Sequence, residues 1–512
     1  MQLHERIFEL ALKRSFFFPS NEPYGGIAGF YDYGPVGVLI KHKIENLWRE
    51  MFIKNEGFLE IQSSLITPEP VLIASGHVAN FSDPVVECLK CKTRIRADHL
   101  AEEKHYEKQG GRWDGKLETL DQIIADQKIV CPRCQGSFGK AYKFNLMFAT
   151  QIGGERVPGY SRPETAQGTF TAFPRLFRNH GTKLPLAVGQ VGRSFRNEIS
   201  PRKGLVRMRE FTQMELEYFF DPLKDKHEIF DSLSTQSLTM MIGGVKKEMT
   251  SGEIVKEKVT ANEIMAYYLV RGWEFYKRAG VDTSKMYYRV LDQNELPHYS
   301  KGNIDMEVET SYGAIETIGN SYRTDFDLSQ HAKQSGKDFS VHVDGRKIVP
   351  HVFEIAMGLD RLFFCILEHC FRDKDEKDEA GNWKHGTAKE WEWFDFPAII
   401  APYHVAVFPL MSKDGLDNKA KEVVSELRLV GLDVDYRESG SIGRRYARAD
   451  EIGIPIAITI DYETLEKGTV TIRYRNTGEQ IRTEIAGIKK VAYALIKGES
   501  WEGIKKAHQL VK

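Results

Sequence analysis

The feature that most constrains this fold is a pair of extended segments within residues 193–220, RSFRNEISPRKGLVRMREFTQMELEYFF. They flank the polar stretch from Ser200 to Gly204, and a Pro- and Gly-containing stretch in that position predicts an antiparallel hairpin. Side chains alternate faces along a strand, so the second segment has an apolar and a polar face. The apolar face comprises Val206, Met208, Met214, Leu216, Tyr218 and Phe220. The polar face comprises Arg207, Arg209, Phe211, Gln213, Glu215 and Glu217.

Two interpretations of the polar face are open. A half-buried sheet with a solvated, charged face is the more common case. The other interpretation is a nucleotide site, because guanidinium groups bind phosphate oxygens bidentately and aromatic rings stack on bases.

The order of residues in this hairpin resembles motif 2 of the class II aminoacyl-tRNA synthetases. That resemblance consists of Phe195-Arg-Asn-Glu198, a basic loop and Arg209-Glu-Phe211, and FTQMELEYF resembles the glycyl-tRNA synthetase version in particular. A helix from about Val38 to Lys54, followed by one strand, FLEIQSSLITP, that ends at Pro68, resembles motif 1. That motif lies at the dimer interface in the family, so the resemblance implies a homodimer.

Two further segments are similar to the same family. RPETAQG, residues 162–168, resembles a glycyl-tRNA synthetase signature, and we expect Pro163 and Glu164 in the first turn of a helix. Gly358-Leu-Asp-Arg361 resembles motif 3, where a strand turns into a helix. The family usually reads Glu-Pro-Ser before this turn, whereas this chain reads Glu354-Ile355-Ala356.

The chain has 512 residues, enough for about two to four domains. Its net charge is −1, so any basic nucleic-acid surface must be local, with candidates at 193–209 and 437–448. We see no secretory signal and no apolar run of membrane-span length, and we expect a cytoplasmic protein.

Four of the six cysteines form two C-x-x-C pairs, Cys88/Cys91 and Cys131/Cys134, separated by 39 residues. Such pairs bring four thiolates round one tetrahedral ion, whereas the alternative is four thiols without metal. The spacing favours structural Zn²⁺, with the two turns meeting across a folded insert.

The segments together predict an α/β (α+β) chain, with an antiparallel class II synthetase-like sheet flanked by helices. We expect the catalytic domain at 1–372, with inserts at 77–143 and 221–300, and a charged linker at 373–396. Residues 397–512 alternate strand and helix and resemble the mixed-sheet, α/β anticodon-binding domain of the family.

The resemblance implies two groups of site residues and Mg²⁺ as a cofactor, with Arg196 and Arg361 as the catalytic residues. The ATP-binding group is Arg196, Asn197, Glu198, Val206, Arg207, Phe211, Glu316, Thr317, Gly358 and Arg361. The glycine-binding group is Arg96, Glu164, Glu215, Arg323, Glu354 and Ala356.

The implied function is glycine–tRNA ligation, with ATP, glycine and tRNA(Gly) as partners and no membrane. Glycine's carboxylate attacks the α-phosphate of ATP, and the glycyl group then passes to the adenosine end of tRNA. Two alternatives stay open: a ligase for another small amino acid, which Ala356 suggests, and a noncatalytic synthetase-like nucleic-acid-binding factor.

Overall fold

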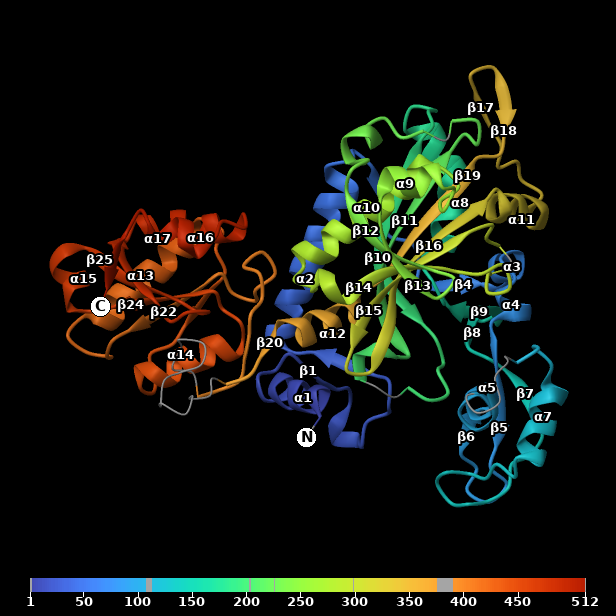
Figure 1. Cartoon of the computed structure of the whole chain (residues 1–512), viewed down its shortest axis with the longest axis horizontal. Coiled ribbons are helices and arrows are strands. Elements are labelled where there is room, and N and C mark those ends of the chain that lie inside the picture. The colour runs from blue at the N-terminus through green and yellow to red at the C-terminus, as the bar shows by residue number, and fades with distance from the viewer. Residues whose placement is uncertain are drawn as a thin grey trace.

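The computed structural model describes residues 2–106, 113–201, 204–224, 226–297, 299–374 and 390–511, and side chains as far as 508. Its centre is a nine-stranded sheet, in which only β3–β10 and β12–β14 are parallel pairs. In spatial order the strands are β13 (Val245–Thr250), β12 (Ser237–Ile242), β14 (Met286–Val290), β15 (Asn303–Thr310), β16 (Gly313–Thr324), β19 (His351–Gly358), β11 (Glu210–Phe220), β10 (Leu186–Phe195) and β3 (Leu59–Glu60). The predicted sheet flanked by helices is confirmed (Figure 1).

Helices cover both faces of this sheet. The helices on one face are α2 (Pro35–Arg49), α10 (Glu263–Arg278) and α12 (Leu359–Cys370). On the other face α8 (Ala166–Asn179) and α11 (Phe326–Ser335) pack on Val188, Phe219 and Val352. The alternation in β11 is as predicted, because Met214, Leu216, Tyr218 and Phe220 are buried in the first of these cores.

The predicted hairpin is β10 and β11, whose last paired residues are Phe195 and Glu210. Its loop is longer than predicted, since Gly204–Val206 forms a 3-10 turn and the chain pairs again only at Glu210. Burial of Leu205 at this turn accounts for the difference. Residues 202 and 203 lie outside the described part.

Two other sequence predictions were wrong in detail. FLEIQSSLITP forms two strands, β3 and β4 (Ile66–Pro68), because its two halves pair in different sheets. Strand β3 pairs with β10 of the central sheet. Strand β4 pairs with β9 (Val157–Ser161) in a separate three-stranded sheet that also contains β8 (Phe148–Ile152). Helix α8 begins at Ala166, so Glu164 precedes it. The backbone just before the helix is held in an extended conformation by hydrogen bonds to other segments. The N–H of Arg162 donates to the carbonyl of Leu65, and the N–H of Phe195 donates to the carbonyl of Arg162.

The insert with the cysteines projects from the sheet as a small lobe (Figure 1). Its described residues form a three-stranded sheet, helices and an apolar core of their own. Its elements are β5 (Ser82–Glu87), β6 (Arg94–Arg96), β7 (Tyr142–Asn145), α5 (Ala97–Ala101) and α7 (Leu117–Asp126).

The C-terminal lobe is a six-stranded mixed sheet, as predicted (Figure 1). In order its strands are β23 (Val434–Tyr436), β22 (Val405–Pro409), β24 (Ile456–Ile460), β25 (Thr469–Tyr474), β26 (Gln480–Glu484) and β27 (Gln509–Val511). Its helices are α13 (Leu416–Leu429), α14 (Ile442–Glu451), α15 (Tyr462–Lys467), α16 (Gly487–Ile496) and α17 (Trp501–Lys505). Most of the predicted linker, residues 375–389, lies outside the described residues.

The lobe packs on the N-terminal part of the chain, where the ring of Phe16 lies 5.2 Å from that of Phe394 and 6.1 Å from that of Phe396. The N-terminal helix α1 (Leu3–Lys13) is followed by Arg14, which forms an ion pair with Glu451 of α14. Among the described helices none has the length and hydropathy to cross a membrane.

The remaining elements are short and mostly connect the larger units. They are β1 (Phe17–Pro19), β2 (Tyr31–Tyr33), α3 (Glu69–Ala74), α4 (His77–Asn80), α9 (Ser251–Lys256), β17 (Val341–Val343), β18 (Arg346–Ile348), β20 (Phe371–Arg372) and β21 (Trp393–Phe394).

Candidate active site

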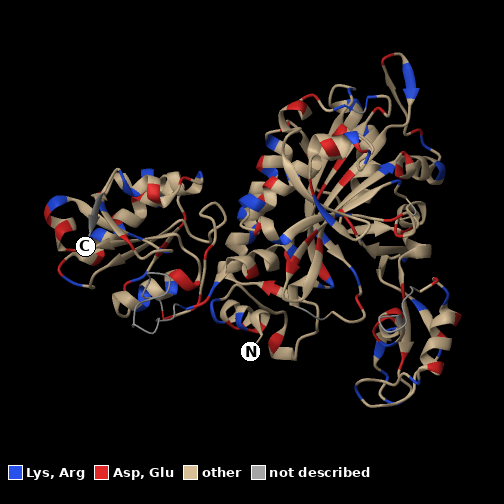
Figure 2. Ribbon diagram, viewed as in Figure 1, with Lys and Arg blue, Asp and Glu red and all other residues tan. Residues whose placement is uncertain are grey.

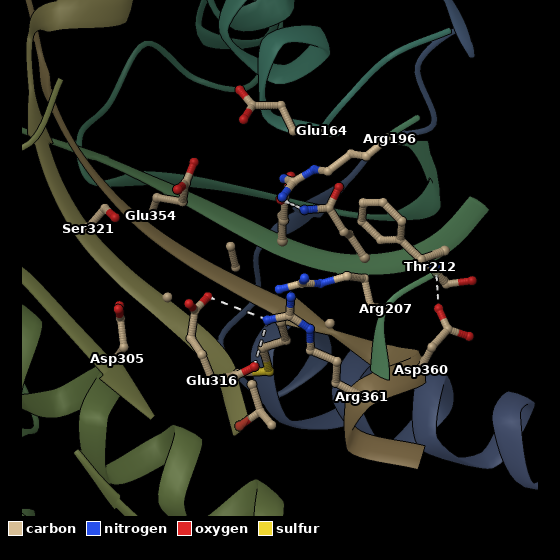
Figure 3. A pocket seen from close by; sticks show the side chains of 18 of the residues that line it. Glu164, Arg196, Arg207, Thr212, Asp305, Glu316, Ser321, Glu354, Asp360 and Arg361 are labelled. Carbon is tan, nitrogen blue, oxygen red and sulfur yellow. Dashed lines mark hydrogen bonds and ion pairs between the residues drawn. The ribbon is translucent and has the colours of Figure 1, made fainter. Parts of the chain in front are cut away.

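A cavity of about 400 Å³ lies on the polar face of β11, β16 and β19. Thirteen of the residues predicted to bind ATP or glycine line this cavity, and six of them form two oppositely charged ends (Figure 3). We call Arg196, Arg207 and Arg361 the arginine end, and Glu164, Glu215 and Glu354 the carboxylate end. The other predicted lining residues are Glu198, Val206, Phe211, Glu316, Thr317, Ala356 and Gly358.

The arginine end is built from the hairpin loop and from the start of α12. The Nε of Arg196 donates to the carbonyl of Pro163 over 3.2 Å, and its guanidinium carbon lies 5.3 Å from the ring centroid of Phe211. Arg361, in the first turn of α12, donates to the carbonyl of Glu316 over 2.8 Å and to that of Val206 over 3.2 Å. These partners are mainly neutral carbonyls, so the guanidinium charges are available to an anion.

Asp360 fixes the position of α12 beneath this end. Its carboxylate accepts the backbone N–H of Thr212 over 2.6 Å and the hydroxyl of Tyr33 over 2.5 Å. Asp360 is buried, and its two hydrogen bonds connect the hairpin strand and the N-terminal segment to the motif 3 helix.

The carboxylate end is buried and strongly hydrogen-bonded. Glu215 accepts the backbone N–H of Thr165 over 3.1 Å, the hydroxyl of Thr165, and the amide of Gln213 over 2.6 Å. Glu164 accepts the amide of Gln167 over 2.8 Å and faces the Nε2 of His77 at 3.4 Å. These bonds hold the oxygens in fixed positions around an empty volume.

Burial and mutual repulsion set the protonation of these acids. Burial raises the pKa of Glu215 to about 7 and that of Glu354 to about 8, and nearby carboxylates add to both shifts. His77 and Arg323 outweigh burial at Glu164 and hold its pKa well below its usual range. Glu217, two residues after Glu215 on β11, is buried, and neither of its carboxylate oxygens has a hydrogen-bond partner among the described residues. Burial is the main reason why the pKa of Glu217 is raised well above its ordinary value. Glu215 and Glu354 therefore keep protons near neutral pH, and a bound cation would favour their charged forms.

Arg323 is not among the residues that line the cavity. It is 2% exposed, and it donates to both oxygens of Glu354 at 3.0 and 3.1 Å and to both oxygens of Asp327 at 2.7 and 2.9 Å. The ring centroid of Tyr299 lies 3.9 Å from its guanidinium carbon. Arg323 therefore contacts the site through Glu354.

Two other predicted residues lie outside the lining. Arg96, in the insert, forms ion pairs with Asp83 at 3.1 Å and with Asp98 at 2.6 Å. The backbone N–H of Asn197 donates to the carbonyl of Leu146 over 2.6 Å.

Sequence reasoning missed several residues that line the cavity or support it. Gln213 was placed on the correct face, but no role was predicted for it. Ser321 shares strand parity with Arg323, a signal that could have found it, whereas Tyr299, Asn303 and Asp305 come from segments without a recognisable motif. The lining residues are Thr212, Gln213, Tyr299, Asn303, Asp305 and Ser321, and the supporting ones are His77, Thr165 and Asp327.

The four insert cysteines lie together, as the spacing predicted, with their sulfurs within 4.8 Å of one another. The Cys88 and Cys134 sulfurs are 3.5 Å apart, and those of Cys91 and Cys131 are 3.7 Å apart. Four sulfurs at about 2.3 Å from a tetrahedral zinc ion are separated by about 3.8 Å, so this set fits the ion.

The two cysteine turns have matching backbones. Lys92 and Gln135, four residues after Cys88 and Cys131, each have a positive φ and donate an N–H to that cysteine's carbonyl. A Cβ at Gly136 would lie 3.1 Å from the sulfur of Cys88, which is closer than an ordinary van der Waals contact. Glycine at this position therefore avoids a steric clash with the cysteine sulfurs.

Comparison with known proteins agrees with this geometry. Residues 160–370 match the model of the class II tRNA synthetase core domain (G, H, P, S and T), and residues 404–494 match an anticodon-binding domain. The chain is 37% identical to a glycine–tRNA ligase of Methanocaldococcus jannaschii, over 94% of this chain and 97% of the relative. It is 38% identical to a glycine–tRNA ligase of Methanothrix thermoacetophila, over 94% of this chain and 95% of the relative. The chain therefore belongs to the glycine–tRNA ligase family of class II tRNA synthetases.

Proposed function

We propose that this chain activates glycine with ATP and transfers the glycyl group to the 3′ end of tRNA(Gly). The observation that carries the proposal is one cavity with three guanidinium groups at one end and three carboxylates at the other. An amino acid bound with its ammonium at the carboxylate end directs its own carboxylate towards a phosphate held by the arginines. No protein nucleophile is required, because glycine's carboxylate attacks the α-phosphate and pyrophosphate leaves.

At the arginine end, Arg196 would contact the α-phosphate, Arg361 the γ-phosphate, and Phe211 would stack on adenine. Preorganised donors aimed at developing charge are worth most in a site of low dielectric constant. Class II synthetases use ATP and Mg²⁺. Glu316, whose carboxylate lies 3.7 Å from Arg361, would hold Mg²⁺, which neutralises phosphate charge when bound.

At the carboxylate end, Glu164, Glu215 and Glu354 would surround the glycine ammonium. We assign Arg323 the role of positioning Glu354, since its donors are engaged by two carboxylates. Direct contact of Arg323 with the glycine carboxylate, and a role for Arg96 at this site, stay predictions of the family resemblance.

We further propose the division into a catalytic part at 1–372, inserts at 77–143 and 221–300, a linker at 373–396 and an anticodon-binding domain at 397–512. Lys and Arg residues alternate with acidic ones along the ribbon of the C-terminal lobe, as Figure 2 shows, so tRNA contacts would be local. Structural zinc at the four cysteines, a homodimer and a cytoplasmic location also remain proposals.

Ala356 bears on one alternative, a ligase for another small amino acid, and its methyl group disfavours that alternative. It lines the cavity opposite Gly319 of β16, and a side chain larger than hydrogen on the substrate would compete with its methyl group for that space. The noncatalytic alternative is less well supported, because all three guanidinium groups line the cavity.

ATP–pyrophosphate exchange with glycine, alanine, serine, threonine and proline in parallel tests the substrate. We expect exchange with glycine and strong rejection of the others, because a closed pocket excludes a methyl group by steric clash. Exchange with alanine or serine at the glycine rate would replace glycine as the substrate. No exchange with any of the five would favour the noncatalytic factor.

A further inference from the structure

Four cavity-lining positions on two neighbouring strands form a square at the carboxylate end. On β16 these are Gly319 and Ser321, and on β19 they are Ala356 and Glu354. Gly319 pairs with Ala356, and Ser321 pairs with Glu354. Residues paired across antiparallel strands have Cβ atoms about 5 Å apart, so the Ser321 side chain lies beside the Glu354 carboxylate, as Figure 3 shows.

The hydroxyl of Ser321 is held in one orientation. It donates its hydrogen to the Oδ1 of Asn303, and the Nδ2 of Asn303 donates to the Oδ1 of Asp305 over 2.6 Å. All three residues are buried. A serine hydroxyl has one hydrogen and two lone pairs, so with its hydrogen on Asn303 this hydroxyl can still accept a hydrogen bond from a ligand in the cavity.

A fixed acceptor among carboxylates is suited to a cation with several N–H groups. An ammonium group has three N–H donors, and three directions must be satisfied when it is removed from water. Position 356, where the family usually has serine, presents a methyl group in this chain. Ser321 carries a hydroxyl on the same face of the sheet, one step diagonally across the square and paired with Glu354.

We propose that Ser321 supplies the hydroxyl contact to the substrate ammonium that position 356 lacks, with Asn303 and Asp305 as its positioning residues. The inference rests on the proposed glycine activation and adds a ligand to that site. The contact has moved from β19 to β16 while remaining next to Glu354.

The test is pyrophosphate exchange by the full-length protein with variants at these two positions. Ser321→Ala should raise the KM for glycine by about 10- to 100-fold, the usual effect of losing a hydrogen bond to a charged group. The KM for ATP and the melting temperature should change little. Ala356→Ser alone should lower the KM for glycine only about two- to threefold, because the ammonium already has a hydroxyl ligand.

The double variant Ser321→Ala/Ala356→Ser gives the decisive result. If one hydroxyl can replace the other, the second substitution should lower the KM for glycine about tenfold or more in the Ser321→Ala background. A matched control is Ser194→Ala, since Ser194 is a fully buried serine of the same sheet that is outside the cavity lining and whose hydroxyl makes no hydrogen bond to the described residues.

An unchanged KM for glycine in Ser321→Ala would overturn the proposal. Equal increases in the KM values for glycine and ATP, without rescue by Ala356→Ser, would also overturn it and indicate a purely structural serine. If Ser321→Ala does not fold, Ser321→Cys keeps the volume with a weaker acceptor and should raise the KM for glycine alone. Failure of the wild-type protein to activate glycine would instead remove the proposed function.

Discussion

The two ends of the cavity reach opposite charges by different structural means. The carboxylate end is rigid before any substrate binds, since Glu164, Glu215 and Glu354 each have protein donors. The arginine end has guanidinium groups that contact mostly backbone carbonyls and the rings of Phe81 and Phe211. One end is thus prepared for a single small cation, and the other for an anion with many oxygens.

The two ends compensate their charges in different ways. Several carboxylates in one buried place repel one another, and Arg323 together with protonation offsets that repulsion. The arginines sit closer to solvent and need no such compensation; Arg361, for example, has a side chain that is 35% exposed. Substitutions should therefore affect folding at the carboxylate end and mainly chemistry at the arginine end.

The largest effect is expected from Arg323→Met, which removes the cation from the carboxylate end. Breaking a buried ion pair by removing one partner costs about 3–5 kcal/mol, or roughly 150- to 5000-fold. We expect a lower melting temperature together with a loss of that order in kcat/KM for glycine, measured by pyrophosphate exchange.

Arg473→Met is the matched control, because Arg473 forms a buried two-bond pair with Asp450 in the C-terminal lobe. It should lower stability without changing the KM for glycine. If Arg323→Met activates glycine normally, Arg323 does not support the carboxylate end.

The second prediction concerns the arginine end, where Arg196→Ala should slow glycine activation with little effect on folding. Loss of one preorganised donor to the transition state costs about 3 kcal/mol, or about 100-fold in kcat. Arg193→Ala, three residues earlier, removes a half-exposed arginine paired with Glu210 and should retain activity. Equal exchange rates for the two variants would contradict the role of Arg196.

The third prediction is a pH dependence that belongs to one end only. The pKa values of about 7 for Glu215 and about 8 for Glu354 mean that both are largely protonated at pH 6 in the free protein. Binding an ammonium requires their charged forms, so the KM for glycine should fall about tenfold from pH 6 to pH 8 through Glu215 alone, and further through Glu354. Glu215→Gln should flatten this dependence, and a flat profile in the wild-type protein would refute the assignment.

The same shifts predict the effect of pH on stability. Between the ordinary glutamate pKa of 4.5 and pH 7–8 the folded protein holds protons that the unfolded chain has released. The contribution of these two groups to the free energy of unfolding should therefore be greatest below pH 4.5 and decrease as pH rises to 8. Chemical denaturation of wild-type and Glu215→Gln proteins at several pH values would measure it.

Much of the architecture could be predicted because the local patterns were strong. The alternation in β11, the helix α2 and the strand–helix junction at Gly358 depend on neighbouring residues along the chain. The cysteine set also followed from spacing alone. Because these features depend on patterns of residues that are close together in the sequence, they could be predicted from the sequence.

The rest depended on contacts between distant segments. The engagement of Arg323 by Asp327 and Glu354 needs the folded sheet, and so does the chain from Ser321 to Asp305. The turn at 204–206 replaced predicted strand because Leu205 is buried there. A family pattern identified which residues surround the cavity but not which of them contact one another.

The smallest effect on glycine activation is expected at the cysteine cluster, which touches neither end of the cavity. Purified protein should carry about one zinc per chain, and Cys131→Ser should lose it, because three thiolates leave the tetrahedral set incomplete. The base of the insert reaches the site through Phe81 beside Arg196 and through His77 beside Glu164, well away from the cysteine turns. Pyrophosphate exchange should therefore stay within about threefold of wild type, while the insert becomes more sensitive to protease. Absence of zinc from protein purified without chelator would contradict the metal assignment, and a 100-fold loss of exchange in Cys131→Ser would show that the insert holds the two ends together.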